Sequence, residues 1–205
     1  MHALSSTAMN KRRTVMHTNI YYKIQEKIKK TGASWDLLAP NKENAIVFAY
    51  IHINPEPKKM IDIYHYSMEY CLAHSGETIN ERFRQDRPDK IDLQIADTVS
   101  KQKNNTPLVL YRGVCAHVFQ LMKENASNLP DTDLYEKGFL QCSLVKGHEI
   151  NAAIKLRIYV PTGYPVIYLG NVNDEQKFYE VDIQHGTKLK IVSIDRQYIN
   201  CYVVF

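Results

Sequence analysis

Three short segments of the chain carry a charged or polar side chain within otherwise apolar, strand-like sequence. The first contains Arg112, the second contains Gln141 and Ser143, and the third contains Glu180. A guanidinium can bind a phosphate through two parallel hydrogen bonds, whereas amide and hydroxyl groups can hydrogen-bond a sugar. A fixed carboxylate can stabilise positive charge that develops during a reaction. Together these side chains suit an anionic, sugar-containing ligand such as a dinucleotide.

The first segment offers a candidate phosphate ligand. Arg112 stands late in a predicted strand whose other residues are apolar or aromatic, and Gly113 follows it. A glycine within a strand allows a ligand to come close to the backbone. The same pattern also fits a structural ion pair at the end of a strand, and the segment alone does not separate the two interpretations.

Side-chain alternation indicates which residues of the other two segments share a face. Glu180 shares a face with Asp182, so this strand presents either a catalytic carboxylate or a solvated acidic face. Gln141 and Ser143 also share a face, so they either hydrogen-bond a carboxylate or a ribose, or belong to a polar edge strand. Cys142 points the opposite way, which predicts a thiol packed in the core rather than a nucleophile.

The elements that must position these side chains change in character near Asn105. Before this point, apolar residues at helical spacing predict helices at 19–31, 34–38, 57–73 and 90–103. Residues 44–53 fit a buried helix or a strand, and residues 77–88 are charged and broken by proline. After Asn105 the sequence predicts a helix at 117–125, an acidic loop at 129–136, and strands at 107–114, 138–144, 154–160, 166–169, 177–184, 188–195 and 198–205. Helices followed by strands indicate an α+β fold.

Length and composition bound the organisation of the chain. It has 205 residues, 44% of them hydrophobic, which is enough for a substantial core. We expect residues 1–18 to form a flexible tail and residues 19–205 to form a single domain, with a helical part at 19–105 and a β-rich part at 106–205. No apolar run approaches the ~18 residues of a membrane span. The N-terminus does not show the pattern of a classical signal peptide.

Charge and cysteine usage exclude several classes of function. The net charge is only +4, and the basic residues are interspersed with acidic ones, which argues against nucleic-acid binding. The four cysteines are scattered and form no CxxC pair, so no zinc site is expected. Reduced thiols and a reducing compartment are the simplest interpretation.

In order and spacing, the three segments resemble the arginine–serine–glutamate class of mono-ADP-ribosyltransferases, which includes many bacterial toxins and secreted effectors. Residues 110–113 resemble the aromatic-arginine motif of the opening strand in that class. Residues 138–144 resemble its glycine-aromatic-x-Ser-Thr-Ser strand, and residues 178–183 resemble its glutamate strand. The resemblance covers residues 107–205, and the helical first half would match the helices that precede and cover the site.

The resemblance implies a fold, a co-substrate and a role for each site residue. The fold would have N-terminal helices packed on a C-terminal, mainly antiparallel split β-sheet that forms a sandwich. NAD would be the co-substrate, with no metal. Arg112 would bind the phosphates of NAD, with Gly113 beside it, and Gln141 and Ser143 would brace the catalytic carboxylate. Glu180 would hydrogen-bond the ribose 2′-hydroxyl and stabilise an oxocarbenium-like transition state as nicotinamide departs.

Two departures from the family pattern bear on function. Gln141 stands where the family usually has the first serine of its motif, the one that contacts the glutamate. Phe178 stands where arginine-modifying members carry a second glutamate, so an acceptor other than arginine is expected: threonine, serine, asparagine, glutamine or a non-protein group. The predicted function is transfer of ADP-ribose from NAD to a protein of a target cell. The alternatives are an NAD glycohydrolase and a degenerate transferase fold that serves as a binding module.

The resemblance also implies a biological setting. It predicts a monomeric effector that is secreted without a classical signal peptide and acts on a protein in the cytosol of a host or target cell. Membrane and nucleic-acid partners are not expected. Residues 146–149 could form a flap over bound NAD or only a polar turn. Residues 170–177 could form the turn that reads the acceptor or only a solvated hairpin connection. His117 follows Arg112 closely and is a further candidate to face the site.

Overall fold

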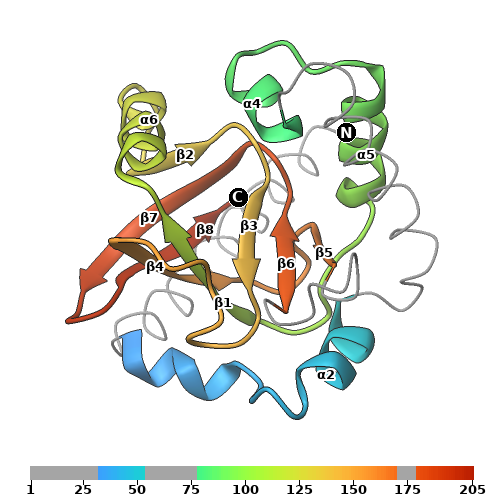
Figure 1. The fold of residues 1–205 in the computed structure, drawn as a ribbon, viewed down its shortest axis with the longest axis vertical. Helices are drawn as coiled ribbons and strands as arrows, with labels where there is room; N and C mark the ends of the chain where they lie inside the picture. The colour runs from blue at the N-terminus through green and yellow to red at the C-terminus, as the bar shows by residue number, and fades with distance from the viewer. Residues whose placement is uncertain (1–31, 54–77, 170–178) are drawn as a thin grey trace, which may run out of the picture.

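The computed structural model describes residues 32–53, 78–169 and 179–205 (Figure 1). Its helices, in chain order, are η1 (Gly32–Leu38, a 3-10 helix), α2 (Ala45–His52), α4 (Ile79–Arg84), α5 (Lys90–Ser100) and α6 (Ala116–Ala126). Its strands are β1 (Leu108–Val114), β2 (Leu134–Glu136), β3 (Leu140–Ser143), β4 (Ile154–Val160), β5 (Val166–Tyr168), β6 (Glu180–Ile183), β7 (Thr187–Ile194) and β8 (Ile199–Val204).

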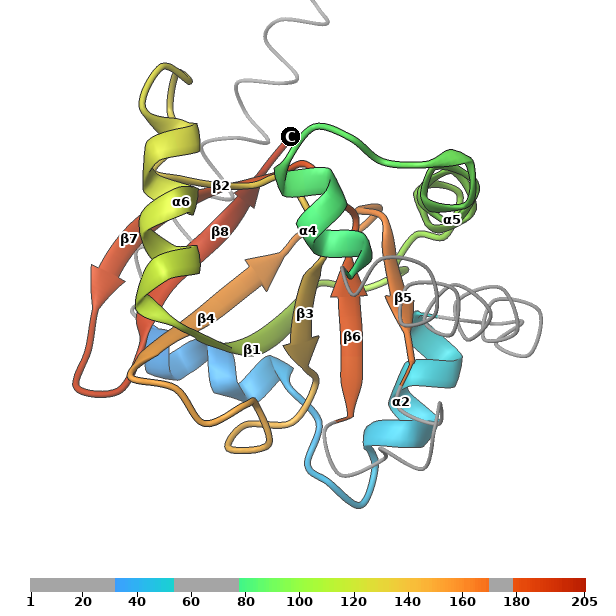
Figure 2. The same ribbon diagram turned by 45° about the horizontal axis from the view of Figure 1, so that its top comes forward.

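The eight strands form one hydrogen-bonded sheet in the order β2-β7-β8-β4-β1-β3-β6-β5. Neighbouring strands are antiparallel except β4 and β8, which are parallel. Helices from the first half of the chain surround the strands of the second half (Figures 1 and 2). The predicted α+β fold with a mainly antiparallel sheet is therefore confirmed.

The sheet has a narrow join between β1 and β3. β1 pairs with β4 along its whole length, from Leu108 to Val114, but it pairs with β3 only where Tyr111 lies opposite Ser143. This join divides the sheet into a larger part, β2-β7-β8-β4-β1, and a smaller part, β3-β6-β5. Arg112 lies on the larger part and Glu180 on the smaller part, so the join decides how the two candidate functional groups face each other.

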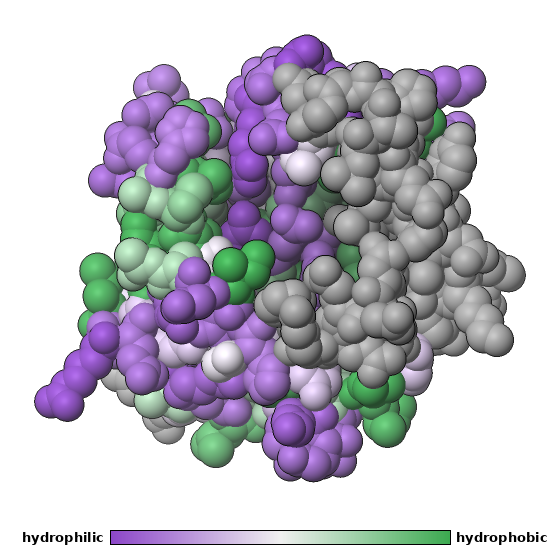
Figure 3. Space-filling view, in the orientation of Figure 1, coloured by the Kyte–Doolittle hydropathy of each residue, from purple (hydrophilic) through white to green (hydrophobic). Residues whose placement is uncertain are grey.

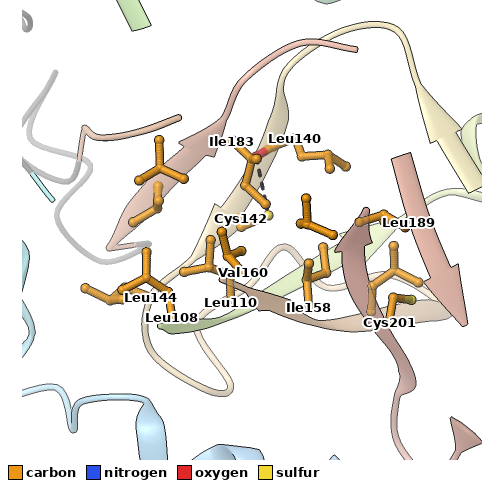
Figure 4. Close-up of a cluster of buried hydrophobic side chains, with 14 of the residues drawn as sticks. Leu108, Leu110, Leu140, Cys142, Leu144, Ile158, Val160, Ile183, Leu189 and Cys201 are labelled. Carbon is orange, nitrogen blue, oxygen red and sulfur yellow. Dashed lines mark hydrogen bonds between the residues drawn. The ribbon is translucent and has the colours of Figure 1, made fainter. Parts of the chain in front are cut away.

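Alternation along β1 sends its side chains into two separate hydrophobic clusters. Leu108 and Leu110 enter the main cluster, together with residues from most of the other strands (Figure 4). Val109 and Tyr111 lie on the opposite face, where they pack against Trp35 of η1. Figure 2 shows η1 passing beneath β1 and β4, in agreement with this packing. The central strand is thus buried on both faces, which fixes the position of Arg112 at its end.

The short helix α4 packs through a third cluster against the end of the sheet. Its side chains Ile79 and Phe83 meet Phe139, which precedes β3, and Ile95 of α5. Thr78 and Glu81 form a capping box, in which the Thr78 hydroxyl accepts from the Glu81 backbone N–H and the Glu81 carboxylate accepts from the Thr78 backbone N–H. These contacts hold the start of α4 beside the strand that carries Gln141.

The structure decides or corrects several expectations about the elements. Residues 44–53, which fitted either a helix or a strand, form α2. Residues 77–88, read only as charged and broken by proline, contain α4, and residues 129–136, expected to be a loop, contain β2. β2 forms because Leu134 is fully buried and its strand pairs with β7, which outweighs the acidic composition of the segment. The helices expected at 19–31 and 57–73, and the tail at 1–18, lie outside the described residues.

Candidate active site

A cleft of about 230 Å³ opens at the join between the two parts of the sheet. On the face of the molecule that Figure 3 shows, hydrophilic side chains gather in the central hollow, over β1 and β3. The cleft is lined by Tyr111, Arg112, Gly113, Gln141, Cys142, Ser143, His148, Glu149, Ile150 and Glu180. All five site residues predicted from the sequence therefore line one cleft.

Arg112 is held at the cleft by its own hydrogen bond across the join. The side chain is nearly buried, and its Nη1 donates to the Gln141 carbonyl oxygen at 2.8 Å. This bond connects β1 to β3 beyond the single position where the two strands pair. Within the described residues, the buried Nε of Arg112 has no hydrogen-bond acceptor. A guanidinium that is fixed in place with a spare buried donor is suited to an anionic ligand.

A second arginine lies close to Arg112 and was not among the predicted site residues. Arg84 of α4 donates from Nε and Nη2 to the two carboxylate oxygens of Glu136, both at 3.0 Å. The Nη2 of Arg112 lies 3.9 Å from the same carboxylate. The ion pair that sequence reasoning left open for Arg112 therefore exists, but Glu136 forms its closer, bidentate pair with Arg84. The three groups together carry one net positive charge.

The Gln141 amide reaches the candidate catalytic carboxylate. Its Nε2 donates to Glu180 Oε1 at 3.4 Å. Asn80 of α4 fixes the orientation of this amide, because Asn80 Nδ2 donates to Gln141 Oε1 at 3.3 Å and leaves the Gln141 NH₂ group facing Glu180. Gln141 therefore makes the contact with Glu180 that the family usually assigns to a serine.

Asn80 is a further residue that sequence reasoning missed, and Gly138 explains how it reaches the site. Asn80 accepts from the Phe139 backbone N–H at 2.7 Å and donates to the Phe139 carbonyl oxygen at 3.3 Å. A Cβ on Gly138 would lie 2.7 Å from Asn80 Oδ1, so only glycine allows this approach. The spacing of Thr78 and Glu81, typical of a capping box, is the sequence signal that could have placed Asn80 in the first turn of a helix.

Glu180 and Ser143 lie opposite each other on neighbouring strands, and Ser143 in turn lies opposite Tyr111. Glu180 is half-buried, at the start of β6. Ser143 is buried, and its hydroxyl donates to the Val145 carbonyl oxygen and accepts from the Val145 N–H. These bonds shape the turn that follows β3. The idea that Ser143 also braces Glu180 stays a prediction.

Cys142 lies between Gln141 and Ser143 in the strand that lines the cleft, but its side chain points into the main hydrophobic cluster (Figure 4). Its Sγ donates to the Leu140 carbonyl oxygen at 3.3 Å. Burial raises the pKa of this thiol to about 12. The expectation of a packed thiol is confirmed.

The segment expected to form a flap, residues 146–149, forms one wall of the cleft. Glu149 anchors this wall: its carboxylate accepts from Lys155 Nζ at 2.9 Å, from the Tyr198 hydroxyl at 2.8 Å and from the Gly147 N–H at 2.8 Å. Burial alone would raise the pKa of Glu149, but these hydrogen bonds outweigh it and hold the pKa below its ordinary value. The wall is therefore tied to the sheet by an ionised carboxylate.

Two further predictions about the cleft are refined by the structure. Gly113 lets a protein segment approach β1, because a Cβ on it would lie 1.8 Å from the Ile150 carbonyl oxygen. His117 is exposed in the first turn of α6 and is not among the residues that line the cleft. Phe178 and the turn at 170–177 lie outside the described residues. Within residues 32–53, 78–169 and 179–205, no group of three or more metal-ligating side chains comes together. Among the described helices, none combines the length and the apolar character that crossing a membrane requires.

The sequence matches the ADP-ribosyltransferase exoenzyme family over residues 43–200. The chain belongs to this family. The match takes in α4, β1, β3 and β6, the elements that carry Asn80, Arg112, Gln141, Ser143 and Glu180. A comparison with curated proteins found no significant match.

Solved structures of bacterial toxins share the fold of this family member. The C3 exoenzyme of Clostridium limosum superposes with a TM-score of 0.60 at 16% identity, over 80% of this chain and 95% of that one. Plx2a, an ADP-ribosyltransferase toxin of Paenibacillus larvae, gives 0.54 at 17% identity, over 80% and 96%. The ADP-ribosylating toxin BECa of C. perfringens, solved with NADH, gives 0.58 at 16% identity, over 78% of this chain but 48% of that one. Its family makes the chain an NAD⁺ ADP-ribosyltransferase, and these structures show the same fold.

Proposed function

We propose that this transferase cleaves NAD in the cleft between β1 and β6 and passes ADP-ribose to a protein, releasing nicotinamide. One observation carries the proposal: Arg112, Gln141 and Glu180 line one cleft and are joined by hydrogen bonds through Gln141. A guanidinium on one side and a carboxylate on the other match the two ends of the reacting part of NAD, a diphosphate and a ribose.

Arg112 binds the diphosphate of NAD in this proposal, because its buried guanidinium is fixed on β1 and has a donor to spare. Glu180 accepts a hydrogen bond from the 2′-hydroxyl of the nicotinamide ribose. When the bond between ribose C1′ and the nicotinamide nitrogen breaks, its electron pair leaves with nicotinamide and positive charge develops on the ribose. The Glu180 carboxylate stabilises that charge, and Gln141 keeps the carboxylate oriented.

The acceptor then attacks C1′ and loses a proton, which completes the transfer. Phe178 occupies the position two residues before Glu180. A phenyl group cannot accept a proton, so the chain lacks at this position the second carboxylate that would activate a guanidinium acceptor. The proposed acceptor is therefore a side chain other than arginine, and mass spectrometry of the modified protein identifies it.

The test uses NAD labelled on its adenosine side, incubated with the protein in the presence and absence of a cell lysate. We expect nicotinamide release and label on a lysate protein. The isosteric Glu180→Gln variant should be slower by about 10²–10³ in kcat, because it removes a fixed charge from the developing cation. A folded Glu180→Gln variant that keeps full activity would contradict the assignment of the carboxylate.

The same assay separates the proposal from its alternatives. If free ADP-ribose forms and no protein is labelled, water is the acceptor and the protein is an NAD glycohydrolase. If NAD binds but is not consumed under any condition, the fold serves as a binding module. Label on protein that disappears in Glu180→Gln supports the transferase and excludes both.

The proposed setting follows from the family, whose structural neighbours carry names of bacterial toxins. We infer that the protein acts as a secreted, monomeric effector on a protein in the cytosol of a host or target cell. Exposing cells to the active protein and to Glu180→Gln, and comparing their modified proteins, tests this inference. An effector should leave ADP-ribose on the same target protein inside cells as in the lysate.

A further inference from the structure

We propose that Glu136 is a positioning residue that holds the guanidiniums of Arg84 and Arg112 side by side for binding of the diphosphate of NAD. This inference rests on the proposed function, which assigns the diphosphate to Arg112. It assigns a role to a buried carboxylate that, like Arg84, stands behind the residues that line the cleft, whereas Arg112 lines it.

The geometry places Glu136 between the two arginines. Arg84 donates to both carboxylate oxygens at 3.0 Å, and Arg112 Nη2 lies 3.9 Å from Oε2, the oxygen that Arg84 Nη2 also contacts. The Gly138 N–H donates to Oε1 at 2.9 Å. One carboxylate therefore hydrogen-bonds the cation from α4 and forms a longer ion pair with the cation from β1, although these elements are distant in sequence.

Glu136 is itself fixed by the sheet and by a hydrogen bond, so it can position the arginine side chains that contact it. It ends β2, where it lies opposite Thr187 of β7, and it is 1% exposed. Its backbone is fixed by the sheet and its carboxylate by the Gly138 N–H. A residue anchored in this way can set the position of the longer arginine side chains, which have more rotatable bonds to restrain.

The charges explain why such a residue is needed. Two guanidiniums held beside one carboxylate repel each other, and the repulsion is strong where water is largely excluded. Glu136 offsets this repulsion and leaves the cluster with one net positive charge. Arg112 still has a buried Nε without a described acceptor, so the cluster retains donating capacity for an anion. Glu136 thus keeps the site ordered yet still attractive to phosphate.

The rival explanation is that the pair of Arg84 and Glu136 only attaches α4 to the sheet. The two explanations predict different kinetics. An attachment role affects stability and all ligands alike, whereas a positioning role affects ligands that contain phosphate. Contacts with the phosphates are made equally in the ground state and in the transition state, so their loss raises KM and leaves kcat nearly unchanged.

The experiment compares the wild type with Glu136→Gln, which has the same shape without the charge. We expect KM for NAD and the Kd for ADP-ribose each to rise about tenfold, with kcat within about threefold of the wild type. The inhibition constant of nicotinamide, which contains no phosphate, should stay within about twofold. Equal changes for ADP-ribose and nicotinamide, or a fall in kcat at constant KM, would overturn the proposal.

Two further variants make the experiment decisive. Asp133→Asn is the matched control: Asp133 immediately precedes β2 and pairs with Lys190, away from the residues that line the cleft, so its loss should leave KM and both ligand affinities unchanged. Glu136→Asp keeps the charge but shortens its reach, and it should raise the Kd for ADP-ribose about threefold. If Glu136→Gln does not fold, Glu136→Asp decides, and wild-type affinity in that variant refutes the positioning role.

Failure of this inference can be told apart from failure of the proposed function. Calorimetric binding of ADP-ribose does not require catalysis, so it tests Glu136 even if the wild-type protein transfers nothing. Absence of NAD cleavage by the wild type counts against the proposed function. Wild-type affinity for ADP-ribose in both folded Glu136 variants counts against the positioning role alone.

Discussion

The candidate catalytic carboxylate Glu180 is oriented by an amide, in a chain of side chains that begins on α4. Asn80 turns the amide of Gln141, and Gln141 donates to Glu180. The sequence predicted that a glutamine amide in place of the family's serine could still donate to this carboxylate. It could not predict Asn80, because that contact joins residues sixty-one positions apart and depends on how α4 packs.

Replacing Gln141 by alanine should lower kcat about tenfold, because a hydrogen bond to a charged group contributes about 1.5–3 kcal/mol and this one is partly exposed to solvent. Nicotinamide release gives the rate. Gln120→Ala is the matched control: its exposed amide also donates to a carboxylate, that of Glu124 on α6, and its loss should leave kcat unchanged. A Gln141→Ala variant with wild-type kcat would show that Glu180 needs no such donor.

Cys142→Ala should keep kcat within about twofold of the wild type, because the thiol faces the core rather than the cleft. A pKa raised to about 12 also means that the thiol remains protonated and unreactive throughout the range from pH 6 to pH 9. Iodoacetamide should therefore modify the exposed Cys115 and spare Cys142 in the folded protein, as peptide mass spectrometry can determine. Loss of activity in a folded Cys142→Ala variant would reopen the question of a nucleophilic thiol.

At the scale of elements, alternation and turn residues predicted the strands well and the short helix α4 poorly. β4 lies where the sequence placed it, from Ile154 to Val160, because its apolar residues leave little ambiguity. The capping-box residues of α4, Thr78 and Glu81, are present in the sequence, but the charged residues around them gave no apolar periodicity from which to predict a helix. The fold forms the ion pairs Arg82–Asp92 and Arg84–Glu136 in its interior, with Arg84 partly exposed, and such pairs leave no periodic pattern in a sequence.

Gly113→Ala tests how closely the wall of the cleft approaches β1. The new Cβ would lie 1.8 Å from the Ile150 carbonyl oxygen, so the wall must move away. Overpacking of this kind costs about 1–3 kcal/mol, which should lower Tm by several degrees and raise KM for NAD. Gly163→Ala offers a comparison, because a Cβ there has nothing within 4 Å and the strain arises only from its positive φ. A Gly113→Ala variant with wild-type Tm and KM would mean that the wall is not fixed.

At the scale of the whole molecule, buried networks of charges connect the cleft to the opposite face of the sheet. Arg157 is almost fully buried and bonds Asp36 of η1 and Asp195 beyond β7, while Asp36 accepts from the Tyr111 hydroxyl. Burial alone would raise the pKa of Asp195, but the backbone N–H groups of Gln197 and Tyr198 and the Arg157 guanidinium lower it strongly. The α+β class and the order of the segments could be read from the sequence. The networks could not, because each joins residues that only the tertiary fold brings together.

Lowered carboxylate pKa values predict how stability depends on pH. The ionised form of Glu149 is favoured in the folded state, so its contribution is complete above the unfolded pKa and is lost as pH falls through the lower folded pKa. Glu149→Gln should therefore lower Tm at pH 7, and the difference from the wild type should shrink as pH falls below about 4.5. Thermal unfolding from pH 3 to pH 7 measures this difference. Glu124→Gln, an exposed carboxylate on α6, is the control, and a constant difference for Glu149→Gln across this range would contradict the expectation.

The single paired position between β1 and β3 has a consequence for the ligand itself. Fluctuations that open the protein locally should begin there, and they would separate the arginine side of the cleft from the glutamate side. A dinucleotide that contacts both sides would hold the two parts of the sheet together at the join between β1 and β3. Binding of NAD would then stabilise the arrangement of Arg112 and Glu180 on which turnover depends. Departure of nicotinamide would remove part of that stabilisation.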